Sequence, residues 1–207
     1  MEAVTKERKK RSGRVIPTYL ICEELNGQPL YYKGYKQVLS GKKNKEEIMG
    51  ASGLQIILIA YMVDLLNSNI NKKAFWVLSG EAGLHIGFRN NVSSDVCVYE
   101  KSKLTPDKIT SNYLDIPPKL VVEVDISVEL ETMTFSDYIL SKTKNLLDFG
   151  TEKVVWIFTR SKKVFIAEPG KDWYFTDWNN TVLLIEGIHF NVAEYLASEG
   201  IEVNESL

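Results

Sequence analysis

The stretch PPKLVVEVDIS, residues 117–127, carries the strongest structural signal in the chain. Its two prolines favour an extended backbone at the start, and the apolar run from Leu120 to Val122 is typical of a strand buried on both faces. Glu123 lies inside this strand, and the two-residue period of a strand predicts Asp125 on the same face. Two such carboxylates would repel each other and raise at least one pKa. The stretch therefore predicts a central strand that carries either a functional acidic site or a structural pair with a Lys or Arg.

A second carboxylate begins another predicted strand, residues 95–99. The alternation of side chains places Asp95 on one face together with Cys97, while Val96 and Val98 lie on the other. An Asp at the start of a strand is commonly a turn residue. Its position becomes informative only when it is combined with Glu123.

The third element is a predicted helix over residues 136–149, which ends at Gly150. On a helical wheel Lys142 lies inside the apolar face, whereas Lys144 lies beyond its edge. A lysine on a buried face needs an anionic partner or must extend its ammonium to solvent. The apolar face comprises Tyr138, Ile139, Leu146 and Phe149.

Together these residues predict a site for phosphodiester hydrolysis. Asp95 and Glu123 on neighbouring strands can hold one divalent cation, and the Lys142 ammonium can reach the same place. The cation would lower the pKa of a bound water, and the ammonium would orient that water and stabilise negative charge in the transition state. With only two His and two Cys in the chain, a zinc finger or a His-rich metal nuclease is excluded by inventory. Carboxylate ligands favour Mg²⁺ or Mn²⁺.

The remaining pattern predicts a mixed α/β (α+β) domain. A hairpin is expected over residues 28–39 with its turn near Lys33 and Gly34, and a largely buried helix over 45–67. A leader over residues 1–15 is expected to be disordered, the domain to cover 16–198, and a tail to follow at 199–207. Further strands are expected over 75–78, 84–88, 153–158, 163–167, 173–176 and 182–185, and a closing helix over 192–197.

Composition limits the function classes. The chain has 207 residues, a net charge of −2, and a cluster of lysines between residues 33 and 45. Near-neutral charge is weak support for a nucleic-acid binder. The apolar run 54–66 is too short to cross a membrane, the start does not fit a signal peptide, and two thiols suggest a reducing compartment. A cytoplasmic protein that does not enter a membrane is therefore expected.

The motif PPKLVVEVDIS resembles the Uma-two family of restriction endonuclease-like proteins, which is common in bacteria and belongs to the PD-(D/E)XK nuclease superfamily. The family pattern of Pro-Pro, Leu-Val-Val-Glu-Val and Ser is matched with one extra residue before Ser127. Lys142 and Gly150 match the spacing of the family's helix, and Trp156 matches the following strand with a shift of one position. The ending IEGI at 185–188 before AEYL at 193–196 is also similar, and the resemblance spans about residues 20–198.

This resemblance implies a restriction endonuclease-like core, with a mixed central sheet flanked by helices, and a Mg²⁺-dependent (or Mn²⁺-dependent) DNA endonuclease. It implies that Asp95 and Glu123 are the metal ligands. It also implies that Lys142 replaces the lysine usually found two positions after the glutamate, where this chain has Asp125. Glu47, on the first long helix, is an additional candidate carboxylate. A homodimer is a further expectation, because cutting both DNA strands favours two-fold symmetry.

The sequence also departs from the family pattern and leaves other functions open. Ser94 stands where the family prefers proline, and Leu146 where it prefers tyrosine. One alternative is a nuclease fold without turnover that binds nucleic acid or protein. Another is an interaction domain with an aromatic contact surface, although aromatic side chains are more often packed in the core. The residues of this aromatic contact surface would be Tyr31, Tyr32, Tyr35, Trp173 and Trp178.

Overall fold

The computed structural model describes residues 16–131 and 133–203, and these form a mixed sheet covered by helices on both faces. The predicted leader over residues 1–15 lies outside the described residues. The strands follow the order β2-β1-β4-β5-β6-β7-β8, and β3 also pairs with β4. Among the paired strands of this sheet in the described residues, β5 and β6 are parallel and the other neighbours are antiparallel. A mixed central sheet flanked by helices is the fold class that the sequence predicts.

The bounds of the elements are as follows. The strands are β1 (Ile21–Leu25), β2 (Gln28–Tyr31), β3 (Phe75–Gly87), β4 (Asn90–Glu100), β5 (Leu120–Val124), β6 (Lys153–Phe158), β7 (Lys163–Ala167), β8 (Tyr174–Asp177), β9 (Val182–Ile185) and β10 (Ile188–Phe190). The α-helices are α1 (Tyr35–Leu39), α2 (Gly53–Asn69), α3 (Phe135–Phe149) and α4 (Val192–Ser198), and short 3-10 helices cover Thr18–Leu20, Lys45–Glu47 and Pro106–Lys108.

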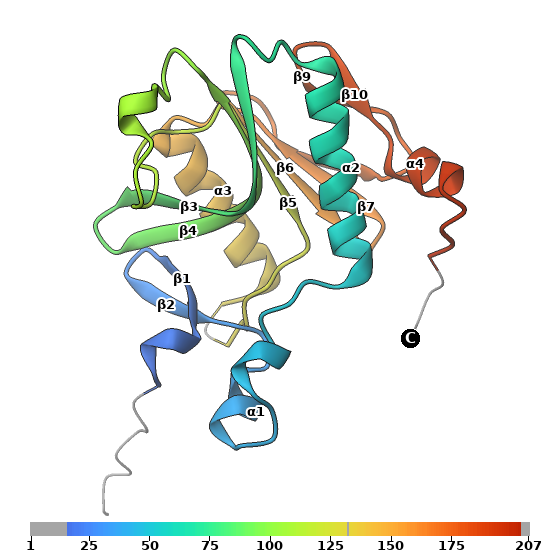
Figure 1. The fold of residues 1–207 in the computed structure, drawn as a ribbon. Helices are drawn as coiled ribbons and strands as arrows, with labels where there is room; N and C mark the ends of the chain where they lie inside the picture. The colour runs from blue at the N-terminus through green and yellow to red at the C-terminus, as the bar shows by residue number, and fades with distance from the viewer. Residues whose placement is uncertain (1–15, 132, 204–207) are drawn as a thin grey trace, which may run out of the picture.

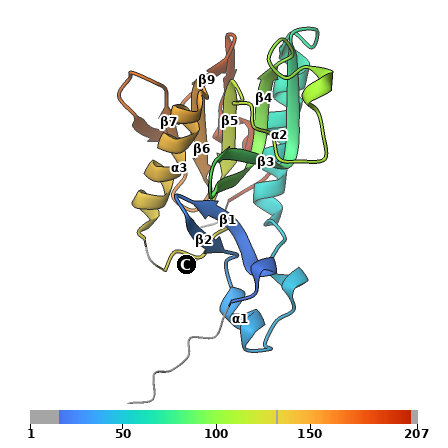
Figure 2. The ribbon, with the colours of Figure 1, turned by 90° about the vertical axis from the view of Figure 1, so that its left-hand side faces the viewer.

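Alternate residues of the central strands belong to two separate hydrophobic cores, one on each face of the sheet. Val96 and Val122 point toward α2 and pack with Leu58 and its neighbours. Cys97 and Val121 point the other way and pack under α3. Helices α2 and α3 accordingly cover opposite faces of the sheet, with β5 between them (Figures 1 and 2). All five residues of β5 are buried, as expected for a strand covered on both sides.

Helix α3 agrees closely with the prediction. It runs from Phe135 to Phe149, and Thr134 and Asp137 form a capping box at its start. Gly150 ends it with a φ of 117°, which a residue with a Cβ adopts only with strain. The predicted strands over residues 153–158, 163–167 and 182–185 are also present with those bounds.

The predicted hairpin over residues 28–39 is wrong. The chain turns earlier, at Asn26 and Gly27, whose φ values of 51° and 79° suit the two-residue turn between β1 and β2. Gly34 has a φ of 88° and precedes the short helix α1 instead of turning a hairpin.

Two other boundaries differ from the prediction. Helix α2 begins at Gly53, because the Ser52 hydroxyl caps it by accepting the Gln55 amide. Residues 45–47 form a separate 3-10 turn. The two strands predicted over 75–78 and 84–88 are one strand, β3, in which a bulge at Gly80 and Glu81 interrupts the pairing.

The five residues of the predicted aromatic contact surface are half-buried or buried, and none of them is exposed. Tyr35 and Trp178 are buried, and Tyr31 stacks on Tyr35 with ring centroids 4.8 Å apart. Trp173 contacts Phe165 edge to face. These side chains mainly pack within the protein, so the interaction-domain alternative loses its main support. Within the described ranges, no helix combines the length and the apolarity needed to span a membrane.

Candidate active site

The register of the central strands brings Asp95 and Glu123 together. Strands β4 and β5 pair antiparallel with Val96 opposite Val122. Continuing this register by one position places Asp95 opposite Glu123, on the face that α3 covers. Both side chains line one small cavity, together with Lys142. The three residues predicted from separate elements therefore converge at one place.

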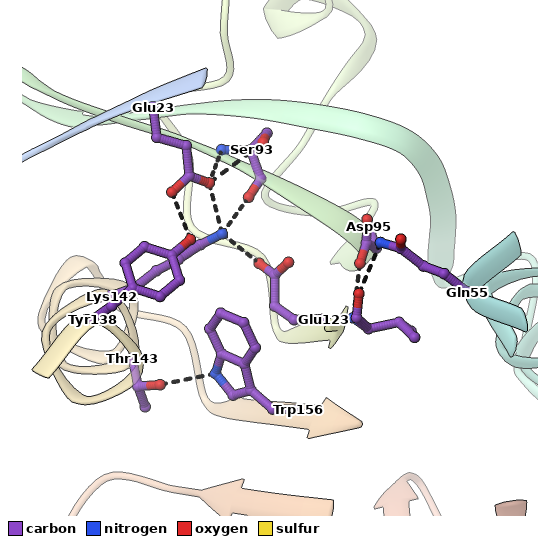
Figure 3. A network of polar contacts seen from close by, with 10 residues as sticks. Glu23, Gln55, Ser93, Asp95, Glu123, Tyr138, Lys142, Thr143 and Trp156 are labelled. Atoms are coloured by element: carbon purple, nitrogen blue, oxygen red, sulfur yellow. Dashed lines mark hydrogen bonds and ion pairs between the residues drawn. The ribbon is translucent and has the colours of Figure 1, made fainter. Parts of the chain in front are cut away.

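Lys142 is held by three protein oxygen atoms (Figure 3). Its Nζ lies 2.7 Å from Glu23 Oε1 and 2.7 Å from the Ser93 carbonyl oxygen. It lies 3.1 Å from Glu123 Oε1, an ion pair without hydrogen-bond alignment. Only 3% of the Lys142 side chain surface is exposed. The structure thus shows an anionic partner for the buried lysine and not an ammonium extended to solvent.

Glu23 is a site residue that the sequence interpretation missed. It is 4% exposed, and its Oε2 accepts the hydroxyl of Tyr138 at 2.8 Å. Its Oε1 also accepts the Ser93 amide at 3.1 Å. The available signal was an acid inside the short strand β1, but the strand itself was not predicted. Without that assignment no strand period could place Glu23 on the inner face.

The backbone of Val124 is fixed on both sides of its Cα atom. Its N–H donates to Asp95 Oδ2 at 2.7 Å, and its carbonyl accepts the side-chain amide of Gln55 at 2.8 Å. Gln55 is a buried polar residue in the apolar run of α2, and this hydrogen bond accounts for its burial. The two contacts hold the end of β5 in position beside the cavity.

Burial dominates the electrostatics of the site. It raises the pKa of Glu123 to about 8, and the negative charges of Asp95 and Glu23 add to this effect while Lys142 opposes it. Burial also raises the pKa of Asp95, against the lowering effect of the Val124 amide and of Lys142. For Lys142, burial acts to lower the pKa, but the carboxylates of Glu123 and Glu23 outweigh it and raise the pKa well above its ordinary value.

Asp125 does not share a face with Glu123, so that part of the prediction is wrong. The strand ends at Val124, and Asp125 turns away with a φ of 59°. Its carboxylate accepts the Thr159 amide at 2.8 Å and the Thr159 hydroxyl at 2.6 Å. Asp125 therefore borders the cavity, but its charge is directed to the start of the β6–β7 turn.

Glu47 is not brought to the site. It lies in the 3-10 turn before α2, where its Oε2 accepts the Asn44 amide at 2.6 Å in a capping box. It lines a separate, larger cleft and not the cavity of Asp95 and Glu123. Its position favours a structural role over that of a third metal ligand.

The small cavity has a volume of about 20 Å³. One water needs about 10–15 Å³ on this measure, so the cavity has room for a single water-sized group. Among residues 16–131 and 133–203, no three acidic, His or Cys side chains form a metal site by themselves. Mg²⁺, however, commonly uses one or two carboxylates and completes its shell with water and phosphate oxygens. Glu123 Oε1 is buried and accepts no hydrogen bond from the described residues, so it suits the role of such a metal ligand.

Comparison with known proteins supports the fold. No family model and no curated protein matches the sequence. A crystal structure of a "putative nuclease belonging to DUF820" from Anabaena variabilis superimposes with a TM-score of 0.63. The match covers 84% of this chain and 89% of that chain at 14% sequence identity. The protein therefore shares the fold of that structure, while the assignment to the Uma-two family stays a prediction.

Proposed function

We propose that the protein is a Mg²⁺-dependent endonuclease that hydrolyses phosphodiester bonds in DNA. The observation that carries this proposal is the convergence of Asp95, Glu123 and Lys142 on one cavity. With Glu23 included, the cluster has three carboxyl groups and one ammonium. Its charge when fully ionised is −2, which a single divalent cation balances. The fold shared with the Anabaena protein, itself described as a nuclease, adds support.

In this mechanism the carboxylates of Asp95 and Glu123 would hold the ion. Asp95 Oδ2 already accepts the Val124 amide, and this contact fixes the position of the carboxylate. When bound, Mg²⁺ lowers the pKa of a water and neutralises charge on the scissile phosphate. The ion would also favour the ionised form of Glu123, whose pKa is raised to about 8 by burial.

Lys142 has three donors, and two of them are used by Glu23 and the Ser93 carbonyl. The third lies toward Glu123 Oε1 without forming a hydrogen bond. It is the donor that can reach a water or phosphate oxygen beside Glu123. Lys142 would thus orient the attacking water and stabilise developing negative charge, while Glu23 and Tyr138 keep its side chain in place.

Cleavage assays test this function directly. Supercoiled plasmid and circular single-stranded DNA would be incubated with Mg²⁺, with Mn²⁺ and with a chelator. The wild type should cleave only with a divalent ion, and Glu123→Gln and Asp95→Asn should lower the rate at least a hundredfold. Glu199→Gln, at an exposed position after α4, is the matched control. Activity that persists unchanged in Glu123→Gln would exclude these residues from the mechanism.

A second candidate is a nuclease fold that binds nucleic acid or protein without turnover. It is favoured by Asp125, which occupies the usual lysine position and bonds to Thr159. An inactive module of this kind should show no Mg²⁺-dependent rise in melting temperature, whereas an intact ion site is stabilised by mass action. The cytoplasmic location and the homodimer remain predictions.

A further inference from the structure

A large cleft lies next to the catalytic cavity. Its volume is about 1110 Å³, and it shares three lining residues with the cavity: Asp125, Ile126 and Ser127. One wall comes from the segment between β2 and α2, and the other comes from the turn between β6 and β7. The cleft exceeds the usual 300–1,000 Å³ of a small-molecule pocket. It is therefore large enough for several units of a polymer.

The cationic side chains that line this cleft have no ion-pair partner among the described residues. Lys33, Lys43 and Arg160 are all exposed, and their side chains form no ion pair or hydrogen bond with any residue that the structure describes. Many other lysines on the surface do form ion pairs, including Lys103 and Lys119. Three such cations, two from the segment 33–43 and one from the β6–β7 turn, thus meet in one cleft of a protein whose net charge is −2.

The acids of the cleft are engaged by the protein itself. Glu47 accepts the Asn44 amide, and Glu129 accepts the Gly34 amide at 2.9 Å. Asp125 accepts both the amide and the hydroxyl of Thr159. These contacts hold the carboxylates in place, and the long cationic side chains remain able to reach phosphates.

Backbone contacts couple the cationic wall to the catalytic strand. The Lys33 amide donates to the Ser127 carbonyl at 2.9 Å, and Tyr32 forms a β-bridge with Val128. Residues 127 and 128 follow β5, the strand that carries Glu123. A polymer in the cleft would consequently pass within a few residues of the catalytic carboxylates.

Aromatic rings in the cleft indicate which form of nucleic acid it suits. Phe135 is 44% exposed, and its ring is supported edge to face by the buried Phe158 at 5.2 Å between centroids. Tyr32 is half-buried and lines the same cleft. Unpaired bases stack on such rings, whereas the bases of a duplex are already stacked on one another.

We propose that this cleft binds single-stranded DNA and delivers it to the Asp95–Glu123 site. Lys33, Lys43 and Arg160 contact phosphates, and Phe135 with Tyr32 stacks against unpaired bases. This inference rests on the proposed endonuclease function, because it specifies which form of DNA reaches the Asp95–Glu123 site. It predicts a preference for single-stranded segments over intact duplex.

Binding measurements separate this inference from catalysis. Fluorescence anisotropy would compare a labelled 20-nucleotide single strand with the duplex of the same sequence, using full-length Glu123→Gln protein in chelator. The single strand should bind at least fivefold more tightly. The triple variant Lys33→Gln/Lys43→Gln/Arg160→Gln should lose at least tenfold in affinity. The slope of its log affinity against log salt concentration should be shallower by about 2 than that of the parent protein. Each phosphate contact on a single strand contributes about 0.7 to this slope, and the variant removes three cations.

Two controls make the result specific. Lys72→Gln/Lys73→Gln removes exposed lysines that do not line the cleft, and should change affinity less than twofold. Phe135→Ala should weaken single-strand binding at least fivefold without changing the salt slope, because stacking releases no counterions. Melting temperatures would verify that each variant is folded.

The outcomes are distinguishable. Equal or tighter binding of the duplex, or a triple variant that behaves like the Lys72/Lys73 control, would overturn the single-strand assignment. Tight single-strand binding by a wild type that never cleaves would instead support the cleft and exclude the proposed endonuclease function.

Discussion

Lys142 Nζ lies 2.7 Å from Glu23 Oε1, although 119 positions separate the two residues in the chain. The pair joins the N-terminal hairpin to α3, and it also places the ammonium 3.1 Å from Glu123 Oε1. A buried cation between two acids links the stability of the fold to the chemistry of the site. The charge balance of this cluster leads to several measurable consequences.

Lys142→Met should lower the free energy of unfolding at pH 8 by about 3–5 kcal/mol, because it leaves buried carboxylates without their cation. The decrease in the free energy of unfolding should be smaller at pH 5, where the carboxyl groups are protonated more readily. Urea titrations at both pH values would measure this decrease. Lys144→Met, on the exposed face of α3, should cost less than about 1 kcal/mol. The prediction is wrong if Lys142→Met equals the wild type at pH 8.

The double variant Glu23→Gln/Lys142→Met tests whether the two residues act as a pair. Removing both charges should be less destabilising than the sum of the two single changes, because neither charge is left alone. A double-mutant cycle from the same urea titrations gives the coupling free energy. Strict additivity would mean that the 2.7 Å contact contributes nothing specific.

Glu123 should make stability fall as the pH rises. Its pKa is raised by burial to about 8 in the folded chain, against an ordinary value of 4.5. Between these values the folded state holds more protons than the unfolded state, so the stabilisation is complete below about pH 4.5 and is lost as the pH rises through about 8. Glu123→Gln should flatten this decline, measured by melting temperature from pH 5 to 9. Glu199→Gln should retain it, and a decline unchanged in Glu123→Gln would contradict the assignment.

The local pattern was enough to predict much of this fold. Helix α3 has a capping residue, a regular apolar face and a terminal glycine, and these place Lys142 on the buried side without any tertiary information. The run before Glu123 predicts the central strand in the same way. What could not be predicted depends on distant contacts.

Glu23 and Asp125 illustrate that limit. Glu23 becomes a site residue only because β1 pairs with β4, which brings Glu23 to Ser93 and to Lys142 of α3. Asp125 leaves the strand because Thr159, 34 positions away, supplies two hydrogen-bond donors to its carboxylate. The cleft likewise joins the cationic segment 33–43 to Arg160. No sequence period relates these positions to one another.

Magnesium should stabilise the wild type and not the ligand variants. At a concentration a hundredfold above the dissociation constant, one bound ion contributes about 2.7 kcal/mol. The rise in melting temperature should be larger at pH 8 than at pH 6, since protons compete with the ion at Glu123. Asp95→Asn and Glu123→Gln should abolish the rise, with sodium chloride of equal ionic strength as the control. A rise retained in both variants would place the ion elsewhere.

Asp125→Ala should lower the free energy of unfolding by about 2 kcal/mol, although Asp125 is not a metal ligand in the proposed mechanism. The change leaves the Thr159 amide and hydroxyl without their acceptor, and it places alanine at a φ of 59°. Asp125→Asn should cost less, because asparagine tolerates this backbone and can still accept one of the two hydrogen bonds.

Asp125→Lys, which restores the residue that the family resemblance implies here, should not rescue cleavage in Lys142→Met. The left-handed turn directs position 125 toward Thr159 and away from Glu123, so rescue by that lysine would show that the turn does not persist in the active protein.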